Sequence, residues 1–438
     1  MSVPPLARIM LLAIISLFSL TRMGVAPARA DFPSELAPTD VERVARQYDC
    51  DIISIDGPTR AILLIPRGVR NNSDEKYHQS FHVACHCYVS NQLITAGAEP
   101  GFTQRFLVYA ADMDGKQLML RVSRLLILLW GQEHKRLHHD HTPDSPTIQV
   151  WLSPRKGVGL SPDIAGEQFK NQIYLYDVAT ERRAIEWLRE VAHEYGHYAI
   201  PGISGFTEPE EWANGVLGER LYLKWFAEEL KAGTLKPTDL PFVTADELNE
   251  YVAKQITPLI QRIEHVGATR AQLQLRDSNG MDTYTALALY IDSTYGTPTL
   301  LRSINATTPA GRDLLAEAPD FYNGFIDAVT GTDTLHASSQ AVVKTDSRTT
   351  FTFYLREGKY GLHFNVPTLE WLLRPISNSV KRLDQTSFVV LKSGWYQITV
   401  TAPPTLPVDP PLSLSLSVSI NRTNAISGNS IGAEVKEK

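Results

Sequence analysis

Two histidines four residues apart, with a glutamate directly after the first, form the stretch His193-Glu194-Tyr195-Gly196-His197. On a helix, residues four apart lie about 40° apart around the axis, so His193 and His197 would share one face. Two neutral imidazoles one turn apart can bind the same Zn²⁺ at roughly 2.0–2.1 Å. Glu194 would lie beside such an ion and could take a proton from a water molecule that the ion activates. The stretch therefore predicts a zinc site with a general base.

A helix has to carry these side chains. Apolar residues recur at helical spacing before and within the motif: Ala184, Leu188, Val191 and Tyr195. Pro201-Gly202 is expected to end the helix. The alternative is an ordinary amphipathic helix with two surface histidines. Gly196 favours the metal site, because an interior glycine costs about 1 kcal/mol relative to alanine and is expected where something approaches the helix closely.

A third metal ligand is expected downstream. Thr207 and Glu210 have the spacing of a capping box, which would make Glu208, Glu210 and Glu211 first-turn charges of a new helix. That helix has an apolar stripe in which Glu219 is the one charge: Trp212, Val216, Glu219, Leu223, Phe226 and Leu230. A carboxylate facing a core needs a partner, because burying it unpaired is costly. Glu219 is therefore the predicted third ligand, and Glu211 is the alternative.

The chain resembles the gluzincin metallopeptidases, the peptidase-MA-like group that includes thermolysin and combines HExxH with a downstream glutamate. The matching pieces are His193–His197, the helix from Trp212-Ala213-Asn214-Gly215 to Glu219, and a later helix Tyr284–Gly296. Many gluzincins carry the ligand glutamate three residues after the tryptophan, where this chain has Gly215; Glu219 lies one turn further on. The resemblance covers the chain from Phe106 to Gly331. It implies a zincin-like α+β fold and a zinc-dependent peptidase.

The resemblance implies two further roles. Tyr284 would donate a hydrogen bond to the oxyanion, although a packed aromatic in a helix is the equal alternative. The strand Gln172–Asp177 would be the edge strand that pairs with the backbone of the substrate. The Gly-x-Met-Glu-Asn motif of the aminopeptidases in this group does not occur in the sequence, so an aminopeptidase is not supported.

Residues 1–30 have the pattern of a cleavable signal peptide, which predicts a secreted or periplasmic protein. Arg8 precedes the apolar core Ile9–Leu20, and Ala28-Arg29-Ala30 resembles a cleavage site. The core is too short for a membrane span, and no later stretch is long and apolar enough to be one. Cleavage after Ala30 would remove three of the 42 basic residues and none of the 48 acidic ones, changing the net charge from −6 to −9.

The acidic balance argues against nucleic acid or anionic membranes as partners. The resemblance to the metallopeptidases implies a peptide or protein substrate. The oligomeric state is not determined by the sequence. The competing hypothesis is a catalytically inactive zincin-fold binding protein that docks a partner through its β domain.

The three cysteines, Cys50, Cys85 and Cys87, have two possible roles. Phe81, Val83, Cys85, Cys87 and Val89 alternate as one face of a strand. In an exported protein a disulfide is plausible, so Cys50 is predicted to pair with Cys85 or Cys87. The alternative is a second metal site built from His82, Cys85, His86 and Cys87.

The chain divides by pattern into segments. Residues 31–100 are β-rich, with strands Thr59–Pro66 and Phe81–Val89. Residues 101–334 form the predicted catalytic domain, with strands Arg105–Ala111 and Thr147–Leu152 and a long helix Lys116–Leu137. The following His138-His139-Asp140-His141 is predicted to be a solvated loop. Ala245–Gly331 is a helical run in which Asp282 would cap one helix and Asp320–Gly331 would be the last.

The C-terminal part is predicted to be a small β-sandwich. Leu335–Thr349 looks like a linker, residues 350–402 form the β domain, and residues 403–438 form a flexible tail. The expected strands are Thr350–Leu355, Tyr360–Asn365, Ser387–Leu391 and Trp395–Thr401. The last two would form a hairpin across Lys392-Ser393-Gly394.

Overall fold

The structure is a computed structural model of the 438-residue chain. It describes residues 32–69, 71–91, 101–138, 147–155, 166–200, 203–305, 320–326, 334–338, 348–355, 358–364, 370–375, 380–382, 387–390, 394–401 and 413–419. The predicted signal peptide and the stretch His139-Asp140-His141 lie outside the described residues. No helix in the described part is long and apolar enough to cross a lipid bilayer. The fold is mixed, combining helices with sheets, which is compatible with the predicted α+β class.

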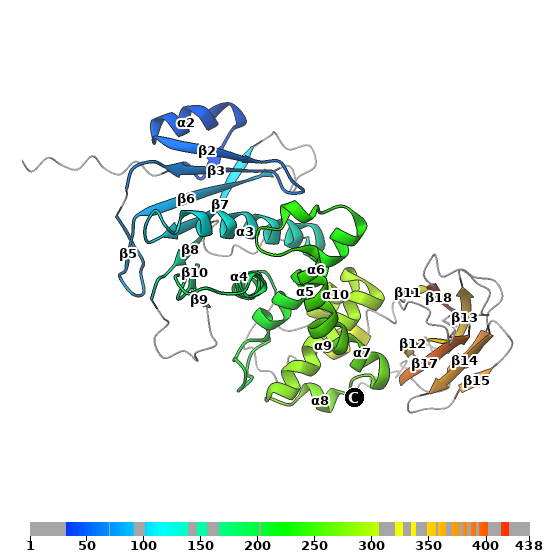
Figure 1. Ribbon diagram of the computed structural model, residues 1–438. Coiled ribbons are helices and arrows are strands. Elements are labelled where there is room, and N and C mark those ends of the chain that lie inside the picture. Colours follow the sequence, from blue (N-terminus) through cyan, green and yellow to red (C-terminus); the bar gives the residue numbers. More distant parts are fainter. Residues whose placement is uncertain are drawn as a thin grey trace, which may run out of the picture.

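An eight-stranded mixed sheet organises the first half of the chain (Figure 1). Its strands in spatial order are β2 (Cys50–Ile55), β3 (Ala61–Pro66), β6 (Val83–Ser90), β7 (Phe102–Ala110), β8 (Ile148–Leu152), β10 (Gln172–Leu175) and β9 (Gly166–Phe169). The short β1 (Glu35–Leu36) pairs with β7, and β4 (Asn72–Ser73) pairs with β5 (Ser80–Phe81) outside the sheet. β7, β8 and β10 run parallel, whereas β9 is antiparallel to β10.

The sheet continues across the predicted domain boundary at residue 100. β6 pairs antiparallel with β7 along its whole length, so residues 31–100 and the start of the predicted catalytic domain share one sheet. The physical reason is burial. Every residue of β6 is buried, and a strand with no exposed face has to lie inside a sheet that is covered on both sides.

Helices cover both faces of this sheet. α2 (Val41–Gln47) packs on one face, and α3 (Lys116–Leu137) crosses the other (Figure 1). Leu64 and Tyr88 face the small core under α2. Leu63 and Cys87 face the main core under α3. The long apolar helix predicted at Lys116–Leu137 is confirmed with the same bounds.

The predicted disulfide is wrong, because the cysteines lie on opposite faces of the sheet. Cys50 belongs to the core under α2, whereas Cys85 and Cys87 belong to the main core under α3. All three are free and buried, and the sulfurs of Cys85 and Cys87 lie 3.8 Å apart. His86 points to the α2 face and stacks on Phe32. Strand alternation therefore places His86 on the opposite face of the sheet from Cys85 and Cys87, the two thiols of the alternative metal site.

The central helices follow the sheet. They are α4 (Ala184–Ala199), α5 (Ala213–Ala232), α6 (Ala245–Tyr251), α7 (Thr257–Val266), α8 (Arg270–Leu273), α9 (Ser278–Tyr295) and α10 (Thr297–Asn305), and residues 320–326 are also helical. A π-helical turn, Val252–Ile256, joins α6 to α7. Asp277, not the predicted Asp282, caps α9 by accepting a hydrogen bond from the N–H of Gly280. α9 ends at Tyr295. Gly296, the expected glycine at the end of this helix, follows with a φ of +87°.

The C-terminal region forms two sheets, which is compatible with the predicted β-sandwich. One has the order β11 (Thr334–Ser338), β18 (Ser413–Ser419), β13 (Gly358–Phe364), β16 (Ser387–Val390), β15 (Val380–Arg382). The other has the order β12 (Arg348–Leu355), β17 (Gly394–Thr401), β14 (Glu370–Pro375). The predicted hairpin is therefore wrong, because β16 and β17 belong to different sheets. β11 lies in the predicted linker and β18 in the predicted tail, so both segments contribute strands.

Candidate metal centre

α4 carries the histidine motif and is held by one buried face. Leu188, Val191 and Tyr195 are at most 1% exposed, which confirms the predicted apolar stripe. Glu186 accepts a hydrogen bond from the backbone N–H of Arg183 at 3.2 Å, which satisfies one free donor at the start of the helix. The helix ends at Ala199, and Ile200 is extended, as expected for a residue that precedes proline.

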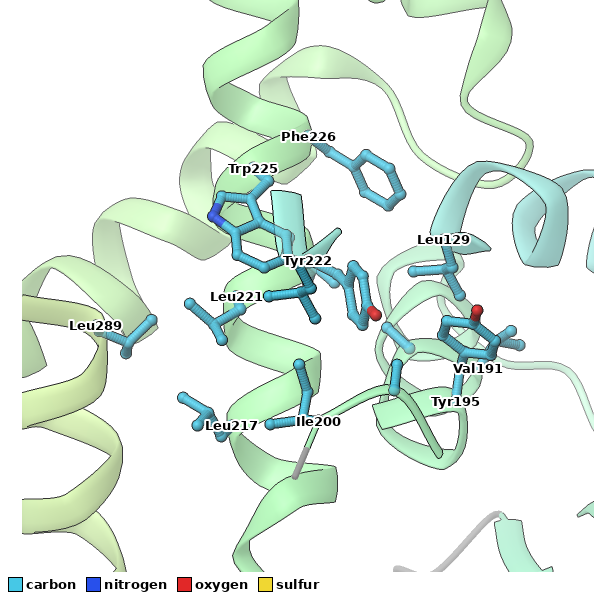
Figure 2. Close-up of a cluster of buried hydrophobic side chains, with 14 of the residues drawn as sticks. Leu129, Val191, Tyr195, Ile200, Leu217, Leu221, Tyr222, Trp225, Phe226 and Leu289 are labelled. Atoms are coloured by element: carbon cyan, nitrogen blue, oxygen red, sulfur yellow. The ribbon is translucent and has the colours of Figure 1, made fainter. Parts of the chain in front are cut away.

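α5 crosses α4 at a glycine contact. An added Cβ on Gly196 would lie 2.8 Å from the carbonyl oxygen of Asn214, and one on Gly218 would lie 2.5 Å from the Cα of Gly196. This confirms the close approach predicted from Gly196. Figure 2 shows the core beside this crossing, where Tyr222 of α5 lies on the side of Tyr195 of α4, and Leu217 and Leu221 point toward Leu289 of α9.

The two imidazoles converge over Gly215 of α5. A Cβ at this position would lie 2.6 Å from the Nε2 atoms of both His193 and His197. The ring centroids lie 5.0 Å apart. The absence of a side chain at Gly215 therefore leaves a space that both nitrogens border.

Glu210 completes this group. Its Oε2 lies 3.2 Å from Nε2 of His193 and 3.7 Å from Nε2 of His197. His193, His197 and Glu210 each offer a ligand atom within 4.8 Å of the others, so the three could hold a metal ion. The spacing of Thr207 and Glu210 predicted a capping box, with Glu210 in the first turn of a helix. That assignment is wrong, because α5 begins only at Ala213 and Glu210 lies in the preceding loop.

Backbone contacts fix the loop that carries Glu210. Ser204 and Trp212 form an antiparallel bridge, and the N–H of Phe206 donates to the carbonyl of Glu211 at 3.3 Å. The N–H of Thr207 donates to the carbonyl of Arg276 at 2.7 Å, which ties the loop to the segment before α9. Glu210 is thus placed by tertiary contacts rather than by a helix.

Glu219, the predicted third ligand, lies behind His193. Its Oε2 is 3.7 Å from Nδ1 of His193, on the opposite side of the ring from Glu210. Its Oε1 accepts hydrogen bonds from Nε of Arg189 at 2.8 Å and from the hydroxyl of Tyr251. The structure therefore gives this buried carboxylate protein partners in place of the expected zinc, and does not bring it to the Nε2 atoms. Glu211, the alternative ligand, is exposed.

Asn214 supports His197 in a similar way. Its Oδ1 lies 3.0 Å from Nδ1 of His197, and its Nδ2 donates to the carbonyls of His197 at 3.0 Å and of Ile200 at 3.2 Å. This network orients the side-chain amide so that Oδ1 accepts from Nδ1–H. The remaining nitrogen of His197, Nε2, is then the one with a free lone pair.

Glu194 is buried beside the histidines. Its side chain lies against the first residue of β9, since an added Cβ on Gly166 would be 2.8 Å from Oε1 of Glu194. Its Oε2 is buried without a hydrogen-bond partner among the described residues, as is Oε1 of Glu210. Burial raises the pKa of Glu194 well above its usual range, although the positive charge on His193 opposes this.

The charges at the centre favour a cation. Burial alone would raise the pKa values of Glu210 and Glu219. The hydrogen bond with His193 and the nearby positive charges together outweigh burial and lower the pKa of both carboxyls. Burial would lower the pKa of His193, but the same two carboxylates raise it well above its usual value. Two ionised carboxylates thus flank His193, and the pKa of His197 is lowered by burial and by the charge on His193.

A cavity of about 740 Å³ opens onto these residues. Its walls come from β9, α4, the Glu210 loop and α5, and the lining residues are Gly166, Glu167, Gln168, Arg189, Glu190, His193, Glu194, His197, Pro209, Glu210, Trp212, Asn214, Val216, Glu219 and Arg220. The metal-binding candidates and Glu194 therefore share one accessible space.

Two expectations drawn from the resemblance differ from the structure. Tyr284 is buried in α9 against Phe321 and does not line the cavity, so it is not brought to the histidines. The strand predicted as Gln172–Asp177 is not an edge strand, because β10 pairs with β8 on one side and β9 on the other. β9 is the last strand of the sheet in the described part of the chain, and it lines the cavity.

Sequence reasoning missed Glu210, Asn214 and β9. The only local signal for Glu210 was the run of acids at residues 208–211, which a helix start explained equally well. Comparison of the chain with protein-family models and with curated proteins finds no match.

Proposed function

We propose that this chain is a zinc-dependent peptidase that hydrolyses peptide bonds with a metal-activated water. The observation that carries the proposal is the convergence of His193, His197 and Glu210 on the space over Gly215, with Glu194 beside them in the same cavity.

The donor set fits zinc. Two imidazole nitrogens and one carboxylate oxygen are a ligand set of catalytic zinc sites, which keep a further position open. The unpartnered buried oxygens of Glu194 and Glu210 and the free space over Gly215 are consistent with a cation there. When bound, the ion would supply Lewis acidity that activates a water molecule and polarises a carbonyl group.

The side chains of the protein would divide the remaining work. Glu194 accepts a proton from the attacking water and passes it to the leaving amine, a transfer that suits a carboxylate whose pKa is raised by burial. Glu219 and Asn214 hold the Nδ1 sides of His193 and His197, so that both Nε2 atoms point to the same space.

β9 would position the substrate. Gly166, Glu167 and Gln168 line the cavity, and Gly166 lies against Glu194. A peptide that adds to β9 as a further strand would carry its backbone past Glu194 through main-chain hydrogen bonds. The signal-peptide pattern of residues 1–30 adds the proposal that the enzyme acts outside the cytoplasm.

Metal analysis together with cleavage of a mixed peptide library tests this proposal. The purified chain should contain about one zinc per molecule and cleave peptides, as a site with one open position predicts. Glu194→Gln should retain the zinc and lose hydrolysis, because it removes the base without removing a ligand. A chain that holds zinc but cleaves nothing would instead favour the inactive binding protein, and a chain without bound metal would refute the proposal.

A further inference from the structure

The cavity at the metal centre contains an arginine, Arg220, that contacts none of the acids around it in an ion pair among the described residues. Glu219 is paired with Arg189, Glu167 with Lys76, and Glu210 with His193. Arg220 forms no ion pair among the described residues, although it is close enough to help lower the pKa of Glu219.

The described residues offer few hydrogen-bond acceptors to the guanidinium N–H groups of Arg220. Its Nη1 donates to the carbonyl of Val216 at 3.1 Å, and its Nε is buried without a partner in the part of the chain that the structure describes. A guanidinium carries five N–H donors, and a buried donor without an acceptor is destabilising. An oxygen ligand entering the cavity would relieve this cost.

The surroundings of Arg220 indicate what kind of ligand fits. Trp212, Val216 and Arg220 follow one another at intervals of four residues, and all three line the cavity. Trp212 is 37% exposed, so the wall offers an apolar surface that leads to a positive charge. A guanidinium binds a carboxylate through two parallel, charge-assisted hydrogen bonds. An amide ligand has no charge and one oxygen, so a guanidinium binds it more weakly.

We propose that Arg220 binds a carboxylate of the substrate near the scissile bond. This proposal rests on the peptidase function proposed above and names its substrate class. The carboxylate belongs either to the C-terminus of a peptide or to an Asp or Glu side chain, and the two sources share the same chemistry.

Matched peptide pairs test the proposal and separate the two sources. The first pair differs in a C-terminal carboxylate against a C-terminal amide, and further pairs differ in Glu against Gln at each position around the cleaved bond. One of these comparisons should favour the acid in kcat/KM by roughly 10- to 100-fold, the effect of a hydrogen-bonded charge pair. Arg220→Gln should abolish that preference, and Arg220→Lys should restore only part of it, because lysine keeps the charge without the fork.

Arg124→Gln is the matched control, because Arg124 is an exposed arginine of α3 that does not line the cavity. It should leave the preference unchanged. Equal cleavage of all acid and neutral pairs, or a preference that survives in Arg220→Gln, overturns the proposal while leaving the peptidase function intact.

Binding gives a readout that does not need turnover. The same peptide pairs are titrated calorimetrically into the zinc-loaded Glu194→Gln chain, with and without Arg220→Gln. If no peptide is cleaved by the native chain but the acid binds more tightly in an Arg220-dependent manner, the peptidase proposal fails and carboxylate recognition stands. If acid and neutral peptides bind equally, or neither binds, carboxylate recognition is overturned.

Discussion

At the scale of single residues, the absence of a side chain at position 215 leaves room for the metal ion that we propose. A Cβ there would lie 2.6 Å from both histidine Nε2 atoms, so Gly215→Ala would push the imidazoles apart or occupy the space between them. We expect Gly215→Ala to fold and to lose most of its zinc affinity, because the atoms it meets are the ends of side chains. Zinc titration with a competing chelator measures this. Gly68→Ala, at a position with no atoms within 4 Å, is the control and should bind zinc like the native chain.

Three glutamates allow the ligand assignment to be tested side by side. Glu210→Gln should weaken zinc binding most, because Glu210 offers the oxygen nearest to the Nε2 atoms. Glu219→Gln should weaken it by about 10- to 100-fold, the effect of losing a group that orients a ligand. The exposed Glu211→Gln should change it little. If Glu219→Gln loses the metal and Glu210→Gln keeps it, Glu219 is the ligand after all.

The residues on α4 could be located from the sequence, whereas the third partner could not. Helical periodicity relates His193, Glu194 and His197 to one another without any knowledge of the rest of the chain. The same periodicity identified Glu219 as a carboxylate that needs a partner. It did not indicate that Arg189 and Tyr251 would be the partners. Glu210 lies in a loop, where no periodic pattern predicts the direction of a side chain.

At the scale of elements, the crossing of α4 and α5 depends on backbone contact. Gly218→Ala would place a Cβ 2.5 Å from the Cα of Gly196, which only a separation of the two helices can relieve. Overpacking of this kind costs about 1–3 kcal/mol. Urea unfolding should show that loss of stability, and zinc affinity should fall with it, because the histidines and Gly215 lie on the two separated helices. Gly57→Ala, which meets nothing within 4 Å, should change neither quantity.

A buried ion pair joins α5 to α9 and makes stability depend on pH. Asp292 accepts hydrogen bonds from Lys224 at 2.7 Å, from Trp225 at 2.9 Å and from Thr297 at 2.7 Å. Burial would raise the pKa of Asp292, but these partners, chiefly the charge of Lys224, outweigh it and lower the pKa. A lowered folded pKa means that the pair stabilises the fold above the unfolded pKa of about 3.9, and that this contribution is lost as the pH falls below it.

Asp292→Asn removes that contribution. The variant should be less stable at neutral pH by about 3–5 kcal/mol, the cost of leaving a buried charge without its partner. Its stability should also fall less steeply than that of the native chain between neutral pH and pH values below about 4. Urea unfolding across this range measures both effects. The exposed Asp56→Asn should follow the native curve, and an identical acid limb for Asp292→Asn would contradict the prediction.

Helices and strands with a clear hydrophobic pattern could be predicted from the sequence, whereas the pairing of one strand with another could not. α3 and the longer strands have clear apolar runs or alternation. β9 has the short, mostly polar sequence Gly-Glu-Gln-Phe and becomes a strand because β10 pairs with it. β16 and β17 were each predicted, but their pairing was wrong. β16 pairs with β13 and β15, and β17 pairs with β12 and β14, and alternation within one strand does not indicate which other strand lies beside it.

At the scale of the whole molecule, Trp395 joins the C-terminal β domain to the helices. Its indole N–H donates to the carbonyl of Ala268 at 2.9 Å, and its ring packs on Tyr290 of α9 and on Phe325. Gln397 donates to the carbonyls of Glu264 and His265 at 3.1 Å. The two sheets and the helices therefore share one hydrophobic core, which Figure 1 shows as the contact between β12, β17 and α7.

Trp395→Ala should loosen this contact. Truncating a buried tryptophan costs about 3–5 kcal/mol, and here the loss falls on the interface with the helices. We expect the β domain to unfold at lower urea concentrations than the helices and to become sensitive to limited proteolysis. Zinc content should be unchanged, because the metal centre lies elsewhere on the helices. A single, unshifted unfolding transition would show that Trp395 does not hold the domain in place.

The tie between Thr207 and Arg276 has a consequence for how the protein matures. A growing chain that has emerged as far as residue 210 already contains all three proposed ligands, but it lacks the carbonyl of Arg276 that anchors the Glu210 loop and the Tyr251 hydroxyl that fixes Glu219. Under the proposed function, the histidines of such an unfinished chain would be ordinary, weak chelators, and the metal site would form only once the helices through α9 have closed around it. Metal would therefore bind late in biogenesis, in the compartment where the chain finishes folding.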